Sequence, residues 1–181
     1  MNKQSIKKHL SIYSIFQKRK TTINHAFASA LAPNDQYDEQ IIDNALRHLG
    51  QNPEEHLKCV YCGNLAETWD HLVGLVKNSE FRGFGHQIGN LVPCCKRCNS
   101  KKGSKDWRKF IQIEITDELE RGKLEEQLEN HIQTYAKYLD LDQIKQKIPQ
   151  ELVRYNELKE QIFNLMREAD KVAQTIRNKG R

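Results

Sequence analysis

Outside its central part, the chain carries apolar residues at intervals of three and four, the spacing of one face of an α-helix. This spacing predicts a helix over residues 5–32, which ends before Pro33, and a second helix over 35–49. A third apolar stripe follows 124–139. A further helix is predicted to begin near Pro149, because proline is favoured in the first turn of a helix. Both flanks of the chain are therefore predicted to be α-helical.

The last predicted helix has the alternating three- and four-residue spacing of a coiled coil over about three heptads, the lower limit for that interpretation. The residues of this series are Tyr155, Leu158, Ile162, Leu165, Ala169, Val172 and Ile176. Three interpretations are open. The helix packs on its own protein, it forms a seam with another chain, or it belongs to an antiparallel helical hairpin.

The centre of the chain differs from its flanks because it contains all five cysteines. Its glycine-rich middle, 81–85, predicts a loop, and 99–113 predicts a helix. The pattern divides the chain into three regions. These are a helical region over 1–53, a cysteine-containing module over 54–112 and a second helical region over 113–181.

The composition predicts a small core that carries long, solvent-exposed helices. Apolar residues are 38% of the chain, below the globular average of roughly 45–50%, which also counts glycine. The formal net charge is +5, but no acidic residue precedes Asp35, and a second basic block contains only one, Asp106. Two basic segments favour a polyanion as partner, and the alternative is a solvated surface face. The segments comprise Lys3, Lys7, Lys8, Lys18, Arg19 and Lys20, and then Lys96, Arg97, Lys101, Lys102, Lys105, Arg108 and Lys109.

Neither a membrane span nor a secretory signal is predicted. The chain has no run that approaches the roughly 18 apolar residues of a span, and no apolar segment follows the N-terminal lysines. We therefore expect a cytoplasmic protein without a membrane partner. In a reducing compartment, clustered cysteines favour metal ligation over disulfide bonds.

Two C-x-x-C pairs predict a structural zinc site. Each pair can reach one ion from a tight turn, and four thiolates make a closed tetrahedral site. The interval between the pairs is longer than the roughly 12–20 residues of ordinary zinc fingers, so it must contain structure of its own. Cys94 could replace Cys95, but its spacing to Cys98 is one residue too long, and we interpret it as a small buried apolar residue. The predicted ligands are Cys59, Cys62, Cys95 and Cys98.

Four polar residues between and just after the cysteine pairs suggest phosphodiester hydrolysis. This reaction needs a base to deprotonate water and a cation to stabilise charge on the phosphate. His71 is a natural base because its ordinary pKa lies near neutrality. Asp70 and Asn99 offer oxygen ligands for a divalent ion, and Asn90 can orient His71 or its loop. If Asp70 and His71 lie on a strand, they point to opposite faces, so converging on one phosphate requires a bent backbone.

In order and spacing, these elements resemble the HNH family of ββα-metal nucleases over roughly residues 56–110. The final histidine of the family name is Asn99 here, a departure that keeps an oxygen ligand. The matching elements are Cys59-x-x-Cys62, Asp70-His71, Asn90-Leu91-Val92-Pro93, Cys95-x-x-Cys98-Asn99 and Lys101-Lys102-Gly103.

The resemblance implies an α+β fold, in which a ββα-metal module with structural zinc is flanked by N-terminal and C-terminal α-helical regions. It implies that His71 is the general base and that Asn90 positions it. Asp70 and Asn99 are implied to hold the catalytic ion, Mg²⁺ or Mn²⁺. The four cysteines are implied to bind the zinc.

The function that this resemblance implies is a divalent-metal-dependent DNA endonuclease whose partner is double-stranded DNA. Within that class we favour a restriction endonuclease, which would cut both strands most simply as a symmetric homodimer. One alternative is a phage or mobile-element nicking nuclease. Another is a non-catalytic, zinc-dependent module that binds nucleic acid. The helical flanks would provide DNA contacts or dimerisation, including contact through the tip of a hairpin.

Further residues near the predicted site have two interpretations each. Basic residues near the start of the helix after the second cysteine pair are candidate phosphate contacts, because charge and helix N-terminal amides act together there. In the glycine-rich loop between His71 and Asn90, Arg82 and His86 either touch DNA or are solvated. We expect Trp69 to support the hairpin as a core aromatic and Trp107 to pack its helix onto the hairpin. The helical DNA-contact candidates are Lys101, Lys102, Lys105 and Arg108.

Overall fold

The computed structural model describes residues 2–77 and 80–180, which pack as two compact units. One unit is Ala28–Leu141. The other joins the described residues up to Phe27 to those from Asp142 onward. The division into 1–53, 54–112 and 113–181 stays a prediction, because these units follow packing rather than sequence composition. The expected mixture of helices and small sheets is confirmed.

A β-hairpin followed by a helix lies at the centre of the unit 28–141. Strand β1 (Thr68–His71) pairs antiparallel with β4 (Leu91–Cys94), and Asp70 lies opposite Val92. Helix α3 (Lys96–Lys102) begins directly after β4, because the sulfur of its N-cap, Cys95, accepts a hydrogen bond from an amide of the first turn. The order strand, strand, helix that the sequence resemblance implies is therefore present.

The chain between β1 and β4 carries a second small sheet and a short helix. Strands β2 (Val76–Lys77) and β3 (Glu80–Phe81) pair antiparallel, and the 3-10 helix η2 (Ile88–Asn90) leads into β4. Gly85 allows this segment to approach residue 33 closely, since a Cβ there would lie 2.0 Å from the Pro33 carbonyl oxygen. As a result, the backbone around His86 forms a bridge with Asn34.

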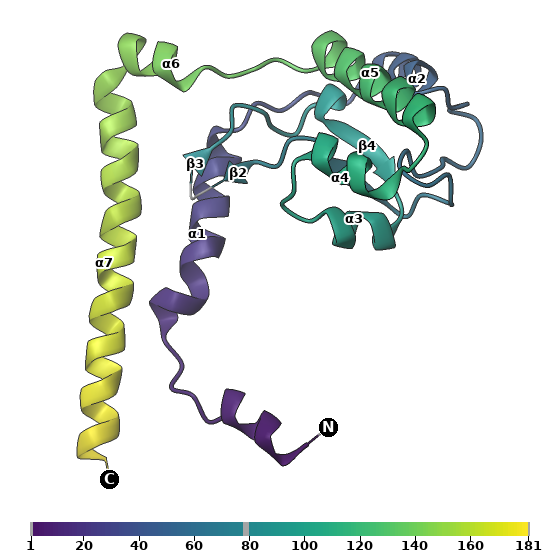
Figure 1. Ribbon diagram of the computed structural model, residues 1–181. Helices are drawn as coiled ribbons and strands as arrows, with labels where there is room; N and C mark the ends of the chain where they lie inside the picture. Colours follow the sequence, from purple (N-terminus) through teal and green to yellow (C-terminus); the bar gives the residue numbers. More distant parts are fainter. Residues whose placement is uncertain (1, 78–79, 181) are drawn as a thin grey trace. The chain divides into compact units, whose positions relative to one another are not determined.

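Three helices complete the packing of this unit. Helix α2 (Glu39–His48) is capped by Asp38 and followed by Gly50 at a positive φ of 70°. Helix α4 (Trp107–Glu114) is capped by Asp106, and α5 (Glu118–Tyr135) by Asp117. In the view of Figure 1, α3 and α4 lie below β4, whereas α2 and α5 lie above it. The predicted single helix over 99–113 is wrong, because Gly103 ends α3 and Asp106 starts α4.

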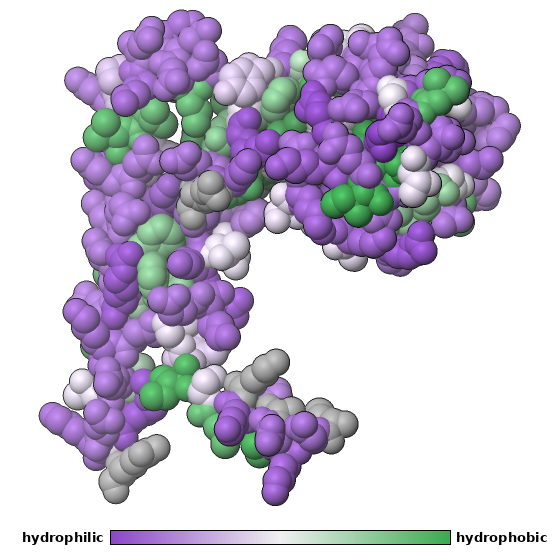
Figure 2. Space-filling model, viewed as in Figure 1, coloured by the Kyte–Doolittle hydropathy of each residue, from purple (hydrophilic) through white to green (hydrophobic). Residues whose placement is uncertain are grey.

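The core of the unit joins the hairpin to α4 and α5. Trp107 is only 1% exposed, so its predicted packing role is confirmed. The prediction for Trp69 is wrong, because this side chain is 47% exposed. The face of the molecule in Figure 2 is mostly hydrophilic, with hydrophobic residues in small groups. The centre of the core contains Leu72, Val92, Trp107, Phe110, Ile111 and Leu128.

The second unit contains the 3-10 helix η1 (Lys3–Lys8), α1 (Ile15–Leu31), α6 (Leu141–Lys147) and α7 (Pro149–Lys179), of which α1 continues into the first unit. The predicted helix over 5–32 is wrong in its first half, since 9–14 are not helical. The α-helix begins where the carboxylate of Asp170 accepts the Ile15 amide at 2.7 Å. Pro149 starts α7, as predicted.

Helix α7 presents two apolar faces. One packs on α1, where the Phe16 and Phe163 ring centroids lie 5.6 Å apart and the Tyr155 hydroxyl donates to the Phe27 carbonyl oxygen at 2.8 Å. The heptad series therefore packs partly on its own protein. Other members of the series are exposed, among them Leu158, Leu165, Val172 and Ile176.

Among the described residues, no helix combines the length and the hydropathy that crossing a bilayer requires.

Candidate functional site

Four cysteines converge in the way that the sequence predicts. The Sγ atoms of Cys59, Cys62, Cys95 and Cys98 all lie within 4.8 Å of one another. The Cys62 and Cys95 sulfurs are 3.7 Å apart. A tetrahedral zinc with Zn–S distances of about 2.3 Å requires sulfurs about 3.8 Å apart. The four thiols therefore fit a structural zinc ion.

The turn after Cys59 shows how the sequence builds half of this cluster. The Cys59 amide donates to the Asn64 carbonyl oxygen at 2.7 Å, and the Gly63 amide donates to the Cys59 carbonyl oxygen at 2.9 Å. Gly63 adopts a φ of 71°, which a residue without a Cβ reaches readily. The turn brings both sulfurs of the first pair to the same side as the sulfurs of the second pair.

The fifth cysteine, Cys94, lies beside the cluster but outside the group of four. Its side chain is buried, and its sulfur lies 3.9 Å from that of Cys59. Hydrogen bonding with Cys94 lowers the pKa of Cys59 to about 4. By contrast, burial raises the pKa of Cys98 above its ordinary value. Cys94 thus favours a thiolate at one corner of the cluster, which is the form that binds a metal.

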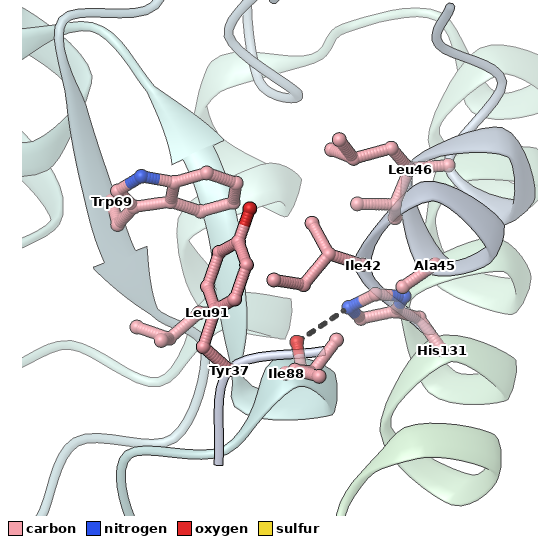
Figure 3. Close-up of a pocket in the computed structure, with 9 residues that line it drawn as sticks. Tyr37, Ile42, Ala45, Leu46, Trp69, Ile88, Leu91 and His131 are labelled. Atoms are coloured by element: carbon pink, nitrogen blue, oxygen red, sulfur yellow. Dashed lines mark hydrogen bonds between the residues drawn. The ribbon is translucent and has the colours of Figure 1, made fainter. Parts of the chain in front are cut away.

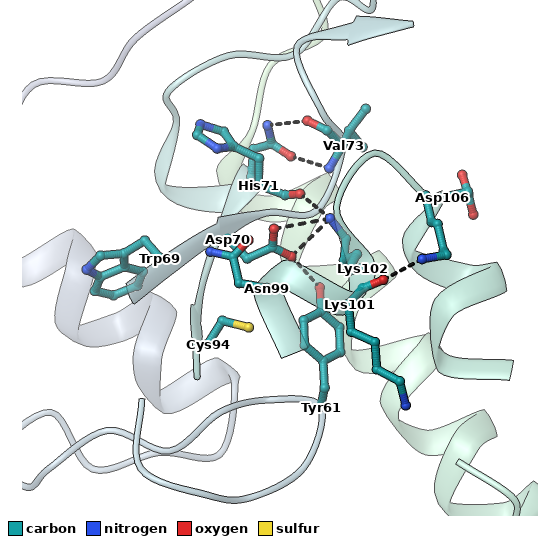
Figure 4. A network of polar contacts seen from close by, with 12 residues as sticks. Tyr61, Trp69, Asp70, His71, Val73, Cys94, Asn99, Lys101, Lys102 and Asp106 are labelled. Carbon is teal, nitrogen blue, oxygen red and sulfur yellow. Dashed lines mark hydrogen bonds and ion pairs between the residues drawn. The ribbon is translucent and has the colours of Figure 1, made fainter. Parts of the chain in front are cut away.

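Asp70 and His71 point to opposite faces of β1, as expected for neighbours on a strand. Asp70 points toward α3 and is only 5% exposed (Figure 4). Its carboxylate accepts the Tyr61 hydroxyl at 2.8 Å and lies 3.0 Å from the Lys102 ammonium. The carboxylate is therefore buried, ionically paired and held in one place.

His71 lies on the other face of β1 and is partly exposed. Its Nε2 is 3.1 Å from Nδ1 of His86, which the glycine-rich loop brings to the same place. Burial lowers the pKa of His71, and the neighbouring His86 lowers it further. The imidazole is therefore neutral near pH 7, which is the form that accepts a proton.

Asn90 is fully buried and holds together the two loops beside His71. Its side-chain oxygen accepts the Val73 amide at 2.8 Å, and its nitrogen donates to the carbonyl oxygens of Val73 and Gly85 at 3.0 Å each. Of the two arrangements considered from the sequence, this geometry corresponds to orientation of the loop rather than direct contact with the imidazole.

Replacing Asn90 by alanine should lower the free energy of unfolding by about 2–4 kcal/mol, because three backbone groups lose a fully buried partner. Chemical denaturation followed by the fluorescence of buried Trp107 measures this loss. The exposed Asn44 offers a matched control, and Asn44→Ala should stay within about 0.5 kcal/mol of the parent protein. A loss below about 1 kcal/mol in Asn90→Ala would show that these bonds do not hold the loops.

Asn99 lies on the same side of β1 as Asp70. It belongs to α3, and its side-chain nitrogen is 3.5 Å from the hydroxyl of Thr68, which shares a face with Asp70. Helix α3 thus brings an amide group toward the buried carboxylate (Figure 4).

A scan against protein-family models decides the family of this segment. Residues 59–105 match the HNH endonuclease family. This segment is an HNH domain. Searches of curated proteins and of solved structures found no match. The HNH domain contains both cysteine pairs, β1, β4 and α3.

The four candidate DNA-contact residues at and just beyond the end of the HNH domain differ in how accessible their charged groups are. Lys101 is exposed and pairs with Glu114 at 2.6 Å, and the exposed Lys105 donates to the Lys101 carbonyl oxygen. Beyond the matched segment, Arg108 pairs with Glu129 on α5 and stacks on the Trp107 ring. Lys102 is buried against Asp70, so this structure gives its ammonium an internal partner instead of a solvent-facing position. Lys101 and Lys105 thus remain the more accessible cations.

The loop candidates of the HNH domain are also separated by the structure. His86 is exposed and meets His71, whereas Arg82 is partly buried, and its amide bonds to the Leu75 carbonyl oxygen. The structure therefore places His86 beside the predicted base, whereas Arg82 bonds through its backbone to Leu75.

Sequence reasoning missed Tyr61, which lies inside the first C-x-x-C pair. Its ring packs edge-on against Phe110 with centroids 5.1 Å apart, and its hydroxyl reaches Asp70. Burial and the charge of Asp70 raise the pKa of Tyr61 well above its ordinary value, so the hydroxyl stays protonated and donates. An aromatic residue between two cysteines shows no link to Asp70 until the chain folds.

An apolar pocket of about 300 Å³ adjoins the face of β1 that carries His71 (Figure 3). Trp69 shares this face because it lies two residues before His71. The figure shows the Tyr37 and Trp69 rings close together at one side of the pocket. Opposite them, His131 donates to the Ile88 carbonyl oxygen at 3.1 Å. Aromatic surface is therefore available next to the predicted base.

Proposed function

We propose that this protein is a divalent-metal-dependent DNA endonuclease, with His71 as the general base and with Asp70 and Asn99 as ligands of the catalytic ion. The observation that carries the proposal is the arrangement on β1 of the HNH domain. A neutral imidazole and a buried carboxylate beside Asn99 are consecutive residues of this strand on opposite faces, so their action on one phosphate requires the backbone of β1 to bend. A base and an oxygen ligand for a hard cation are the minimum that phosphodiester hydrolysis needs.

The donor atoms fit a hard divalent ion. Asp70 offers carboxylate oxygens and Asn99 an amide oxygen, the ligand types that Mg²⁺ and Mn²⁺ prefer. A carboxylate has about four lone-pair directions, so the bonds from Tyr61 and Lys102 do not exhaust it. When bound, such an ion stabilises negative charge on the phosphate and on the leaving oxygen.

The other residues of the domain support His71. Asn90 fixes the loops on which the imidazole depends, and the zinc cluster ties the start of the domain to α3. His71 accepts a proton from the attacking water, and the exposed Lys101 and Lys105 attract the phosphate backbone. His86 joins them at the loop side of His71.

Within this class, we propose a restriction endonuclease that acts as a homodimer on double-stranded DNA. The support is that the described HNH domain offers one predicted base, so two copies would cut two strands. The exposed apolar positions of α7, such as Leu165 and Val172, offer a surface for a second copy. A nicking nuclease of a phage or mobile element is the alternative, and it would act as one copy.

Digestion of a plasmid of known sequence tests the proposal. The zinc-loaded protein with Mg²⁺ or Mn²⁺ should convert supercoiled plasmid to defined linear fragments, and sequencing of the ends should show one recurrent sequence. Open circles without linear product would instead support the nicking alternative. Intact plasmid with both ions, together with intact genomic DNA, would contradict nuclease activity.

A non-catalytic zinc module that binds nucleic acid is the second candidate. The observation in its favour is the internal pairing of Asp70 with Lys102, which satisfies the carboxylate without a metal ion. This candidate predicts DNA binding that is unchanged by substitution of Asp70 or His71, with no second metal bound. Measurement of divalent-ion binding therefore separates the two functions.

Trp69 provides a spectroscopic test of where nucleic acid binds. Of the two tryptophans, Trp69 is half exposed on the His71 face, whereas Trp107 is buried. Addition of DNA without divalent ions should therefore quench Trp69 emission, because bases and phosphates approach its ring. Fluorescence titration measures the effect, and Trp69→Phe should lose most of it. A quench of equal size in Trp69→Phe would place the DNA away from this face.

A further inference from the structure

Lys102 is the last residue of α3, and its charged group lies in the interior of the domain. The side chain is 2% exposed. Its ammonium lies 3.2 Å from Oδ1 and 3.0 Å from Oδ2 of Asp70, and it donates to the His71 carbonyl oxygen at 2.7 Å. An ammonium has three protons, and this arrangement offers a partner to each.

This pairing occurs at the carboxylate that the proposed function assigns to the divalent ion. The ammonium faces both oxygens of Asp70, and the Tyr61 hydroxyl takes a further position on Oδ2 at 2.8 Å (Figure 4). A cation is thus already resident beside the only buried carboxylate of the described residues. A divalent ion that binds Asp70 has to approach within a few ångströms of this ammonium.

Two cations that share one carboxylate repel each other. A unit and a double charge at 4–5 Å repel by several kcal/mol at an effective dielectric constant of about 20, typical of partly buried sites. A buried ammonium that loses its partner is also costly, so Lys102 has to move outward when a divalent ion takes over Asp70. Its flexible stem at the end of a helix allows such a movement.

We infer that Lys102 is a resident counter-ion that competes with the divalent cation for Asp70, so that cation binding displaces the Lys102 ammonium toward solvent. The inference rests on the proposed function, because it takes Asp70 as a metal ligand. In the metal-free protein, Lys102 holds Asp70 and the backbone of His71 in place. In the metal-bound protein, the displaced ammonium joins Lys101 and Lys105 as a cation that a phosphate can reach.

Binding of Mn²⁺ to the zinc-loaded protein tests the competition directly. Lys102→Met keeps an unbranched side chain that is one atom shorter and removes the charge, so Mn²⁺ affinity should rise on the order of tenfold or more. The exposed neighbour Lys101 gives the matched control, and Lys101→Met should change the affinity less than about threefold. Asp70→Asn should abolish this binding. Titration calorimetry or the electron paramagnetic resonance signal of free Mn²⁺ measures all four proteins.

Unchanged or weaker Mn²⁺ binding by Lys102→Met, with zinc content and fold retained, would overturn the inference. So would the absence of Mn²⁺ binding from the parent protein. Neither measurement uses cleavage. A protein that binds Mn²⁺ as predicted but leaves DNA intact would therefore contradict the proposed function and leave the competition standing.

Amine labelling of the unaltered protein provides a second test, which holds even if Lys102→Met does not fold. An acetylating reagent and peptide mass spectrometry should show Lys102 protected without divalent ion, whereas Lys101 is labelled. Saturating Mg²⁺ should raise the labelling of Lys102 several-fold and leave that of Lys101 nearly constant. Protection of Lys102 that persists at saturating Mg²⁺ would overturn the displacement.

Discussion

Replacing His71 by alanine should lower the rate of DNA cleavage by about 10²–10⁴-fold, the usual contribution of a general base. The imidazole lies on the accessible face of β1, and its lowered pKa keeps it ready to accept a proton at neutral pH. Folding should be little affected, since Lys102 bonds to the backbone carbonyl of residue 71, which alanine retains. Single-turnover cleavage of a plasmid with Mg²⁺ or Mn²⁺ measures the rate.

The matched control for this variant is His56→Ala, since His56 is exposed in the same unit. His56→Ala should cleave at the parental rate. Retained Mn²⁺ binding and DNA binding in His71→Ala would show that the loss concerns the chemical step. If His71→Ala cleaves DNA as fast as the parent protein, His71 is not the base, and the proposed mechanism fails.

Loss of the structural zinc should unfold the HNH domain, the second large effect that we expect. Structural zinc contributes about 10–16 kcal/mol of binding free energy in small zinc domains, which is comparable to the whole stability of a typical domain. Cys98→Ala removes one of four thiols that lie within 4.8 Å of one another. The variant should therefore lose zinc and the burial of Trp107. A colorimetric zinc assay and Trp107 fluorescence measure these losses.

Cys94 provides the matched control for the zinc prediction, because it is a buried cysteine next to the cluster but outside the group of four. Cys94→Ala should retain one equivalent of zinc and lose only about 1–2 kcal/mol of stability. If Cys94→Ala releases zinc as Cys98→Ala does, the assigned ligand set is wrong. If Cys98→Ala stays folded without zinc, the metal does not support the fold.

Features that depend on neighbouring residues were predictable from the sequence. The C-x-x-C spacing predicts a pair of convergent thiols, because a tight turn with Gly63 suffices to bring Cys59 and Cys62 together. Strand periodicity predicts opposite faces for Asp70 and His71. Proline starts α7 at residue 149, as its fixed φ and missing amide suggest. Each prediction needs only the covalent geometry of a short segment.

Features that depend on partners far along the chain were not predictable in the same way. The start of α1 depends on Asp170, which lies 155 residues beyond Ile15, so the apolar period alone placed the start too early. Trp69 was expected in the core, but the packing of α4 and α5 fills the core with Trp107 and leaves Trp69 half exposed. Both differences arise because residues far along the chain set the contacts of a local segment.

The sequence by itself determined the order of the chemical groups of this protein: two thiol pairs, an Asp-His pair between them and two asparagines near the second pair. The strand–strand–helix order that carries these groups was implied by the resemblance of these motifs to the HNH family rather than by local periodicity. Only the tertiary structure decided which charges meet. Lys102 belongs to a run of basic residues that suggested contact with DNA, or else a solvated surface, yet α3 turns its ammonium inward onto Asp70. The reason is that a buried carboxylate is stable only with a partner, and only the fold determines which cation can reach it.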